Sequence, residues 1–188
     1  AFALAQQYEV PMTVFPLGER IQPEDAELWQ TIAASDWEIG SHTYRHTKIG
    51  RQDKYNLMFS LMKVQEQLDA VLGYHYPIRS VRPPFGNYTD DQDSARQVVS
   101  VCRAVGVEHL VLWDVSQTDP DKAVRKVQNG SILLFHARPK DVRCLARLIP
   151  ALQEKGFTFV TVSELLGFEP LATSTDLYVY DKNQYRQQ

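Results

Sequence analysis

The sequence predicts an α/β protein with a mainly parallel sheet, and three observations predict it. Short apolar runs alternate with amphipathic segments along most of the 188 residues. A chain of this length with 44% hydrophobic residues suits one globular domain with an ample core rather than two domains. Polar clusters follow several of the apolar runs, which is where parallel α/β folds place their functional residues.

Six short apolar runs are predicted to be strands that alternate with helices. Alternation of this kind specifies a mainly parallel sheet with helices outside it. Six strands fall just short of a closed barrel, and a complete eightfold barrel usually needs about 250 residues. We therefore expect a distorted or incomplete (β/α) barrel that lacks its first strand in this chain. The predicted strands are residues 10–15, 37–39, 78–81, 109–113, 131–135 and 157–162.

Helices are predicted in the segments between the strands. Pro23, followed by two acidic residues, is expected to open a helix that runs to about Ser35. A stripe of leucine and valine side chains predicts a second helix that Gly73 ends. Thr89 and Gln92 match a capping box at the start of a third helix. The helices predicted after Ser35 span residues 54–72, 89–105, 119–128 and 140–155.

Both ends of the chain carry expectations about its organisation. Residues 1–8 have the apolar spacing of a helix but no cap before them, so we expect the chain to be a piece of a longer protein. After Phe168 the periodicity fades into a segment that bears proline, threonine and tyrosine. We therefore predict one domain over residues 1–167 and an extension or linker over residues 168–188.

Composition argues against several classes of partner. The formal net charge of −3 provides no basic field for nucleic acid or anionic lipid. No apolar run approaches the roughly 20 residues that a membrane-spanning helix needs. Cys102 and Cys144 are the two cysteines, and each lies in a predicted helix. We interpret them as small buried side chains rather than as a disulfide framework.

The clearest candidate metal ligands are His42 and His46, which follow the predicted strand at residues 37–39. Four residues apart on a helical turn, their imidazoles would point the same way and hold one divalent ion. The alternative is a pair of exposed loop histidines. A catalytic metal usually has a third protein ligand and an open position for water, so a carboxylate is expected from elsewhere.

Two further residues are candidates because of where they lie. His136 ends an apolar strand, where a charged imidazole needs a polar cavity or a partner, and its alternative is a hydrogen-bonded core histidine. Arg82 precedes two prolines that stiffen its loop, so it would pair with a carboxylate or anchor an anion, or else form a surface salt bridge. His75 and His109 have no comparable setting, and we interpret both as structural.

The order of these motifs resembles the polysaccharide deacetylase family, the NodB-homology domain of carbohydrate esterase family 4. The resemblance runs from about residue 10 to residue 166, and its most specific part is the HTxxH motif at residues 42–46. The motifs that carry it, in chain order, are GSHTYRH, RPPFG, GSILLFH and GFTFVTVSELL.

The resemblance implies a role for each candidate residue. His42 and His46 would bind zinc, or cobalt or another divalent ion. Arg82 would orient an acidic catalytic residue, and the backbone N–H of Phe85 would help to form the oxyanion hole. His136 would be the general acid that protonates the departing amine, a role suited to a group that titrates near neutrality.

Two features depart from the family pattern. The first motif of the family carries paired aspartates, one the base and one the third metal ligand, and we expect them upstream of residue 1. The fourth motif usually has an aspartate and, four residues on, a tryptophan, whereas this chain has Ser116 and Pro120 there. Asp114 or Asp119 would then compensate, or the tuning of His136 would differ.

The activity that the resemblance implies is hydrolysis of a carbon–nitrogen bond other than a peptide bond. The substrate would be an N-acetylated polysaccharide, such as peptidoglycan or a chitin-like glycan, in the cell envelope or outside the cell. One alternative is a catalytically inactive member that binds glycan or serves as a scaffold. Another is a related amidase that acts on a small non-sugar substrate. No feature of the sequence favours one oligomeric state.

Overall fold

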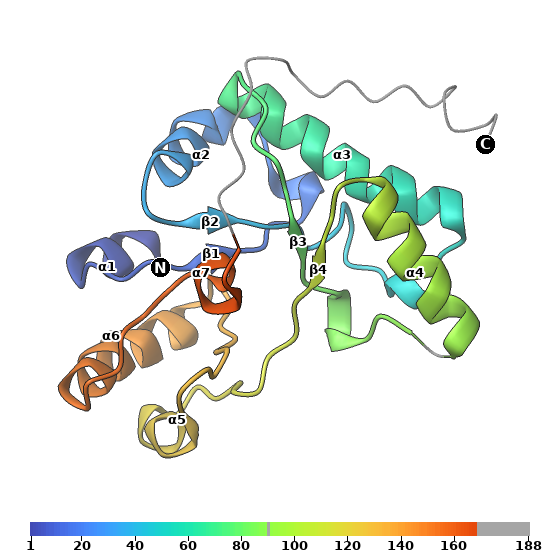
Figure 1. The fold of residues 1–188 in the computed structure, drawn as a ribbon. Helices are drawn as coiled ribbons and strands as arrows, with labels where there is room; N and C mark the ends of the chain where they lie inside the picture. Colours follow the sequence, from blue (N-terminus) through green and yellow to red (C-terminus); the bar gives the residue numbers. More distant parts are fainter. Residues whose placement is uncertain (90, 169–188) are drawn as a thin grey trace. The chain divides into compact units, whose positions relative to one another are not determined.

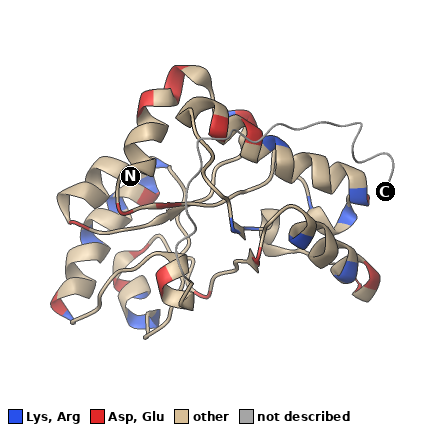
Figure 2. Cartoon of the chain, turned by 45° about the horizontal axis from the view of Figure 1, so that its top comes forward, with Lys and Arg blue, Asp and Glu red and all other residues tan. Residues whose placement is uncertain are grey.

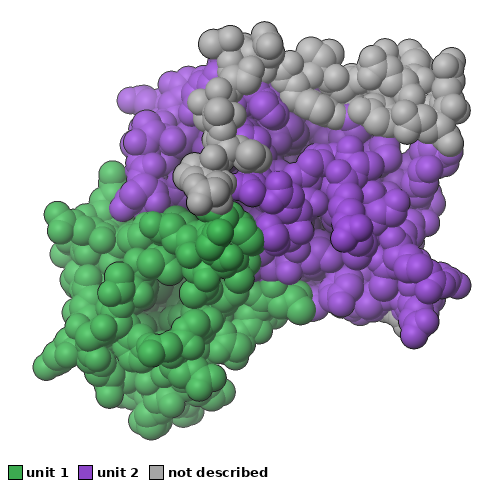
Figure 3. All heavy atoms as spheres, viewed as in Figure 1, with its two compact units in different colours: residues 1–13, 112–169 green, residues 14–111, 170–188 purple. Residues whose placement is uncertain are grey.

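The computed structural model describes residues 1–89 and 91–168. The described chain divides into two compact units, which are coloured separately in Figure 3. Unit 1 comprises residues 1–13 and 112–168, and unit 2 comprises residues 14–89 and 91–111. Apart from Phe168, the predicted extension over residues 168–188 lies outside the described residues.

Unit 2 is built around short strands that lie side by side (Figure 1). β3 pairs with β4 in parallel, with Ser80 opposite His109, and a parallel bridge joins Ser41 to Val81. The N–H of Gly40 donates to the Val14 carbonyl at 2.8 Å, which ties the end of β2 to β1. The parallel pairing predicted for this region is confirmed. The strands are β1 (Thr13–Val14), of which Val14 belongs to unit 2, and β2 (Glu38–Ile39), β3 (Ser80–Val81) and β4 (His109–Leu110).

The strands are shorter than predicted, and two predicted strands are absent as strands from the described residues. The run at 131–135 contributes only a parallel bridge between Leu133 and Val115. The run at 157–162 joins no ladder, and its last residue begins a helix. Apolar character specifies burial, whereas a strand also needs a neighbouring backbone to pair with. Phe157 and Phe159 accordingly pack against core clusters without pairing.

The longest helix, α3 (Lys54–Leu72), has the bounds predicted from its apolar stripe. Asp53 caps it by accepting the N–H groups of Tyr55 and Asn56 at 3.0 and 2.9 Å. These backbone bonds, that of Asn56 foremost, hold the pKa of Asp53 below its usual value. Gly73 ends the helix with φ of 80°, a conformation that favours glycine.

The helix predicted from Thr89 begins later, as α4 (Gln92–Ala104). Its capping box consists of Asp91 and Ser94, so the predicted pairing of Thr89 with Gln92 is wrong. The Asp91 carboxylate accepts the N–H of Ser94 at 2.7 Å. α3 and α4 bury one core against β3. Its members are Ile49, Leu57, Met58, Leu61, Met62, Val81, Val98, Val101, Cys102 and Val107.

The remaining helix of unit 2 and its short 3-10 turns connect these elements. The predicted helix from Pro23 to Ser35 is a 3-10 turn followed by α2, which buries Trp29 and Ile32. The bounds are η1 (Gly18–Arg20), η2 (Pro23–Asp25), α2 (Ala26–Ala33), η3 (Ile49–Arg51) and η4 (Pro84–Gly86).

Unit 1 is mainly helical. Ala123 of α5 packs with Leu148 and Leu152 of α6, and all three are almost completely buried. α7 begins with a capping box in which Thr161 and Glu164 bond reciprocally. The helices are α1 (Phe2–Gln7), α5 (Pro120–Lys126), α6 (Pro139–Glu154) and α7 (Val162–Leu166). Throughout the described ranges, no helix combines the length and apolar character needed to cross a bilayer.

Candidate active site

His42 and His46 lie in the loop that follows β2. The helical turn predicted for them is wrong, because residues 44–46 form bends. Thr43 instead reverses the chain with φ of 68°, in the left-handed region. The two imidazole rings nevertheless come together, with centroids 4.9 Å apart and planes at 65°. The loop therefore pairs the histidines by a route that the sequence spacing did not reveal.

Several hydrogen bonds hold the strained Thr43 in place. Its N–H donates to the Ser41 hydroxyl at 3.1 Å, and its own hydroxyl donates to the Arg45 carbonyl at 2.6 Å. Its carbonyl accepts the N–H of Gly18 at 3.0 Å. A non-glycine residue in this conformation costs about 1–3 kcal/mol and persists only where its surroundings fix it. Strain of this kind is common at functional sites, which makes the loop a candidate for function.

A backbone carbonyl orients the imidazole of His42. Its Nδ1 lies 2.6 Å from the carbonyl oxygen of Arg82, and because a carbonyl can only accept, Nδ1 carries the proton. The neutral ring then has its lone pair on Nε2. Metal-binding histidines are typically oriented in this way by a second hydrogen bond. The arrangement therefore suits His42 for metal binding through Nε2.

The side chain of Arg82 is buried, with 7% of the residue exposed. Its guanidinium lies over the Phe15 ring, 4.6 Å from the centroid. Burial lowers the pKa of Arg82 to about 10, which leaves the group charged at neutral pH. The alternative considered from the sequence, a surface salt bridge, does not fit because the side chain is buried.

Phe85 follows β3 in η4 and also has a left-handed backbone, with φ of 62°. The residue is 61% exposed, and its ring contacts the ring of His46, with centroids 4.5 Å apart. The ammonium of Lys48 lies 6.0 Å from the same ring. The structure thus brings four predicted site residues together in unit 2, because His46 contacts both His42 and Phe85, and His42 contacts Arg82.

His136 belongs to unit 1, where its side chain is half exposed. Its backbone N–H donates to a carboxylate oxygen of Asp141 at 3.2 Å. The same oxygen lies 3.9 Å from the imidazole Nδ1, an ion-pair distance rather than a hydrogen bond. Asp141 itself is buried, with 2% exposed. Sequence reasoning missed Asp141, which reads simply as an acid in the first turn of α6.

The two aspartates considered as replacements for the fourth motif are engaged elsewhere. Asp114 accepts the N–H of Ile132 at 2.6 Å and the hydroxyl of Ser131 at 2.7 Å. Asp119 caps α5 and accepts the N–H of Lys122, which holds the pKa of Asp119 below its usual value. Neither aspartate forms an ion pair with His136 within the described part of the chain.

The two histidines interpreted as structural have acidic neighbours. The Nδ1 of His75 lies 2.7 Å from the buried carboxylate of Asp69. That carboxylate also accepts the side chain of Gln65 at 2.7 Å and the N–H of Tyr76 at 3.1 Å. His109 lies 3.5 Å from Glu108. These contacts are in keeping with a structural role.

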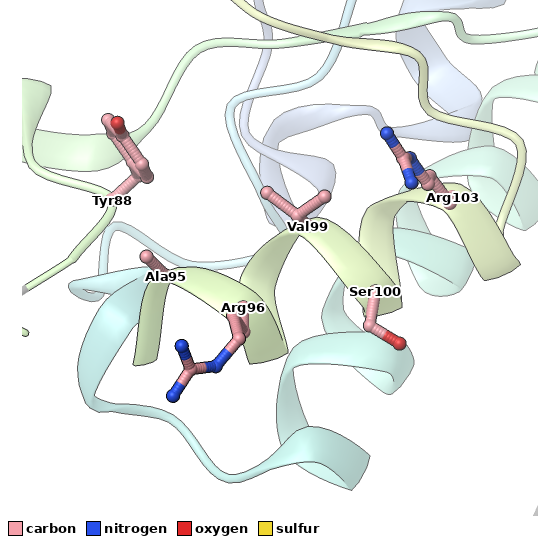
Figure 4. A pocket seen from close by; sticks show the side chains of 6 residues that line it. All are labelled: Tyr88, Ala95, Arg96, Val99, Ser100 and Arg103. Carbon is pink, nitrogen blue, oxygen red and sulfur yellow. The ribbon is translucent and has the colours of Figure 1, made fainter. Parts of the chain in front are cut away.

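A separate open cavity of about 540 Å³ lies along α4 (Figure 4). Arg96 and Arg103 line the cavity from different turns of the helix. None of the predicted site residues lines it. Basic and acidic residues are both spread over the helices of the chain (Figure 2), so charge alone does not single out one face.

Comparison with known proteins establishes the family. The family described as polysaccharide deacetylase matches residues 1–101, more than half of the 188 residues. The chain belongs to the polysaccharide deacetylase family. The peptidoglycan-N-acetylglucosamine deacetylase of Bacillus cereus is 28% identical over 181 residues, covering 88% of this chain and 80% of that protein.

Two further comparisons concern length and fold. The uncharacterized protein YlxY of Bacillus subtilis is 26% identical over 172 residues, and the chain spans about half of its length, 51%. The crystal structure of BA3943, a CE4 family pseudoenzyme from Bacillus anthracis, superimposes with a TM-score of 0.74 at 22% identity, covering 91% of this chain and 60% of that one. This likeness shows the fold and confirms the predicted mixture of helices and sheet.

His42 and His46, the two predicted metal ligands, both lie within the described residues. Among residues 1–89 and 91–168, no three His, Cys, Asp or Glu side chains are grouped so that they could hold a metal ion. The paired imidazoles and the carbonyl that orients His42 nevertheless fit a divalent metal, since nitrogen ligands with a fixed tautomer suit zinc and its neighbours.

Proposed function

We propose that this chain is a metal-dependent hydrolase that removes acetyl groups from N-acetylated polysaccharide in the cell envelope or outside the cell. The observation that carries the proposal is the pairing of His42 with His46 beside the Arg82 carbonyl, in a member of the polysaccharide deacetylase family. Peptidoglycan is the first substrate to test, because the Bacillus cereus relative is a peptidoglycan deacetylase. We also propose that the fold is an incomplete (β/α) barrel and that the catalytic domain spans residues 1–167.

His42 and His46 would hold the divalent metal, with zinc or cobalt as the ions to test. When bound, such an ion supplies Lewis acidity toward a carbonyl and lowers the pKa of water. The chain's own contribution is to fix the ligands. The Arg82 carbonyl keeps the proton of His42 on Nδ1, and the packing of Phe85 on His46 restricts the second ring.

Three other groups would act on the substrate directly or through a neighbour. The N–H of Phe85 would donate to the oxygen of the acetyl group as negative charge develops there. The charged Arg82, fixed by burial against Phe15, would orient an acidic group of the site. His136 would donate its proton to the nitrogen of the departing sugar amine.

A second candidate is a glycan-binding member without activity. It is favoured by Ser116, which stands where the fourth motif of the family usually has an aspartate. This alternative keeps the carbohydrate partner and removes the hydrolysis. It predicts binding to insoluble peptidoglycan without acetate release.

The test is acetate release from peptidoglycan and from N-acetylglucosamine oligomers, with zinc or cobalt added and with EDTA. The wild type is compared with His42→Ala, and with His75→Gln as a matched histidine control in the same unit. Metal-dependent release that His42→Ala abolishes and His75→Gln retains supports the hydrolase. Sedimentation with insoluble peptidoglycan in the absence of release under any metal supports the binding protein instead.

A further inference from the structure

We propose that Asp141 is the positioning carboxylate of His136, holding its imidazole and favouring its protonated form. The inference rests on the proposed role of His136 as the proton donor. It concerns a residue outside every motif that the sequence singled out. Both side chains belong to unit 1, where His136 precedes α6 and Asp141 lies in its first turn (Figure 1).

The carboxylate of Asp141 is buried. Its side chain is 3% exposed, and a buried carboxylate needs a positive partner or several hydrogen bonds. Within the described ranges the structure gives it one ion-pair partner, the imidazole of His136 at 3.9 Å. Its Oδ2 is buried and has no hydrogen-bond partner among those residues. A proton on the His136 imidazole would therefore offset the negative charge of the Asp141 carboxylate.

Oδ1 of Asp141 accepts the backbone N–H of His136 at 3.2 Å and lies nearest to Nδ1 of its ring. A carboxylate near Nδ1 favours a proton on that nitrogen and stabilises the imidazolium. The imidazolium then gives its Nε2 proton to the leaving amine and becomes the neutral ring protonated on Nδ1. One proton moves, and Asp141 stays ionised throughout.

Two other carboxylates of unit 1, on or next to α5, have basic partners. Asp119 pairs with Lys122 at 3.7 Å, and Asp121 pairs with Arg147 at 4.0 Å. One turn along α6, burial and then the charge of Asp141 raise the pKa of the Cys144 thiol, so Asp141 also affects a second titrating neighbour. Asp141 is therefore the acid whose removal most directly alters His136.

The test is the pKa of His136, measured by NMR titration of the imidazole in the wild type and in Asp141→Asn. The asparagine retains an oxygen that can accept the His136 N–H but has no charge. We expect the imidazole of His136 to lose its proton at lower pH in Asp141→Asn than in the wild type, as loss of a neighbouring opposite charge predicts. Asp114→Asn is the control, because Asp114 is hydrogen-bonded to Ser131 and Ile132 in the same unit. This variant should leave the titration of His136 unchanged. Equal values of that pKa in the wild type and Asp141→Asn would overturn the proposal.

Activity provides a separate readout. If acetate release occurs, the alkaline limb of the pH profile of kcat should move to lower pH in Asp141→Asn, by the change found in the titration of His136. KM should stay unchanged. Asp141→Glu should move the limb part of the way back. A change in thermal stability alone, with the limb unmoved, would mean a purely structural role and overturn the proposal. Absence of acetate release from the wild type would count against the proposed function, while the titration would still decide the role of Asp141. If Asp141→Asn does not fold, the Asp141 carboxyl resonance of the wild type should show an inflection where His136 titrates, and its absence would contradict the pairing.

Discussion

The Nδ1 of His42 donates to the carbonyl oxygen of Arg82 over 2.6 Å, which links the two loops that follow β2 and β3. The bond depends on the isolated parallel bridge between Ser41 and Val81. The N–H of Ser41 donates to the Ser80 carbonyl, and the N–H of Arg82 donates back to the Ser41 carbonyl, each at 2.9 Å. The pairing at this bridge therefore sets the tautomer and the direction of the candidate metal ligand.

This relationship predicts that metal binding requires both imidazoles. We expect His42→Ala and His46→Ala each to weaken zinc binding at least about 10–100-fold, the range seen when even outer groups of a metal site are lost. Titration calorimetry with zinc alone measures the effect. His75→Gln should bind zinc as the wild type does, because His75 is engaged with Asp69. Equal zinc affinity in all four proteins would refute the assignment of the ligands.

Phe85 offers a test of backbone strain near the same site. Phe85→Gly and Phe85→Ala both remove the ring that contacts His46, but only glycine adopts φ of 62° without strain. We therefore expect the glycine variant to be more stable than the alanine variant by about 1 kcal/mol. Thermal unfolding gives the difference. Should alanine prove the more stable, the left-handed conformation of residue 85 would be wrong.

The sequence was most informative where a local signal agreed with packing. α3 was predictable at both ends because its apolar stripe, Asp53 and Gly73 all indicate the same bounds. The run at 157–162 was misinterpreted because its alternating apolar residues also fit a strand. The competing signal was the capping box of Thr161 and Glu164, which begins α7. Periodicity alone did not show which signal would prevail.

The candidate site was predictable only in part, for a related reason. His42, His46, Arg82 and Phe85 follow strands in chain order, and parallel strands bring such positions to one edge. The partner of His136 was not predictable, because the sequence around Asp141 carries an ordinary helix-start pattern. Its burial and its distance from the imidazole depend on how α6 packs, which no local pattern encodes.

The start of β4 predicts a small dependence of stability on pH. The guanidinium of Arg79 donates to Glu108 at 2.7 Å, and chiefly this bond lowers the pKa of Glu108 from 4.5. A carboxyl group with a lowered folded pKa stabilises the fold above its unfolded pKa and loses that contribution as pH falls through the folded value. At pH 7 we expect Glu108→Gln to lose about 0.2–1 kcal/mol, the range for exposed pairs.

Urea unfolding of the wild type and Glu108→Gln at several pH values between 7 and 3 measures this effect. The difference between the two proteins should shrink below pH 4.5, where Glu108 becomes protonated in the unfolded and then in the folded state. Asp93→Asn, which breaks an exposed pair with Arg96 within one helix, is the control for general surface charge. A difference that stays constant across the pH range would contradict the assignment.

Gly40 provides the last prediction, because a side chain at this position would reach the support of Arg82. A Cβ on Gly40 would lie 2.5 Å from the Phe15 ring. The guanidinium of Arg82 lies over that ring, 4.6 Å from its centroid. Gly40→Ala should therefore destabilise the protein by about 1–3 kcal/mol through overpacking and should displace Arg82. Gly73→Ala is the matched comparison, since a Cβ there meets nothing within 4 Å and costs only the strain of its positive φ.

Urea unfolding gives the two free energies, and the double variant Gly40→Ala with Phe15→Leu identifies the cause. If the Phe15 ring is the obstacle, the smaller side chain should reduce the cost of Gly40→Ala relative to its cost in the wild type. Equal costs in both backgrounds would show that the clash lies elsewhere, for example with the Ser80 hydroxyl 2.7 Å from the added Cβ. A double variant that is stable but weakly active would show that Gly40 preserves the position of Arg82 rather than the stability of the sheet.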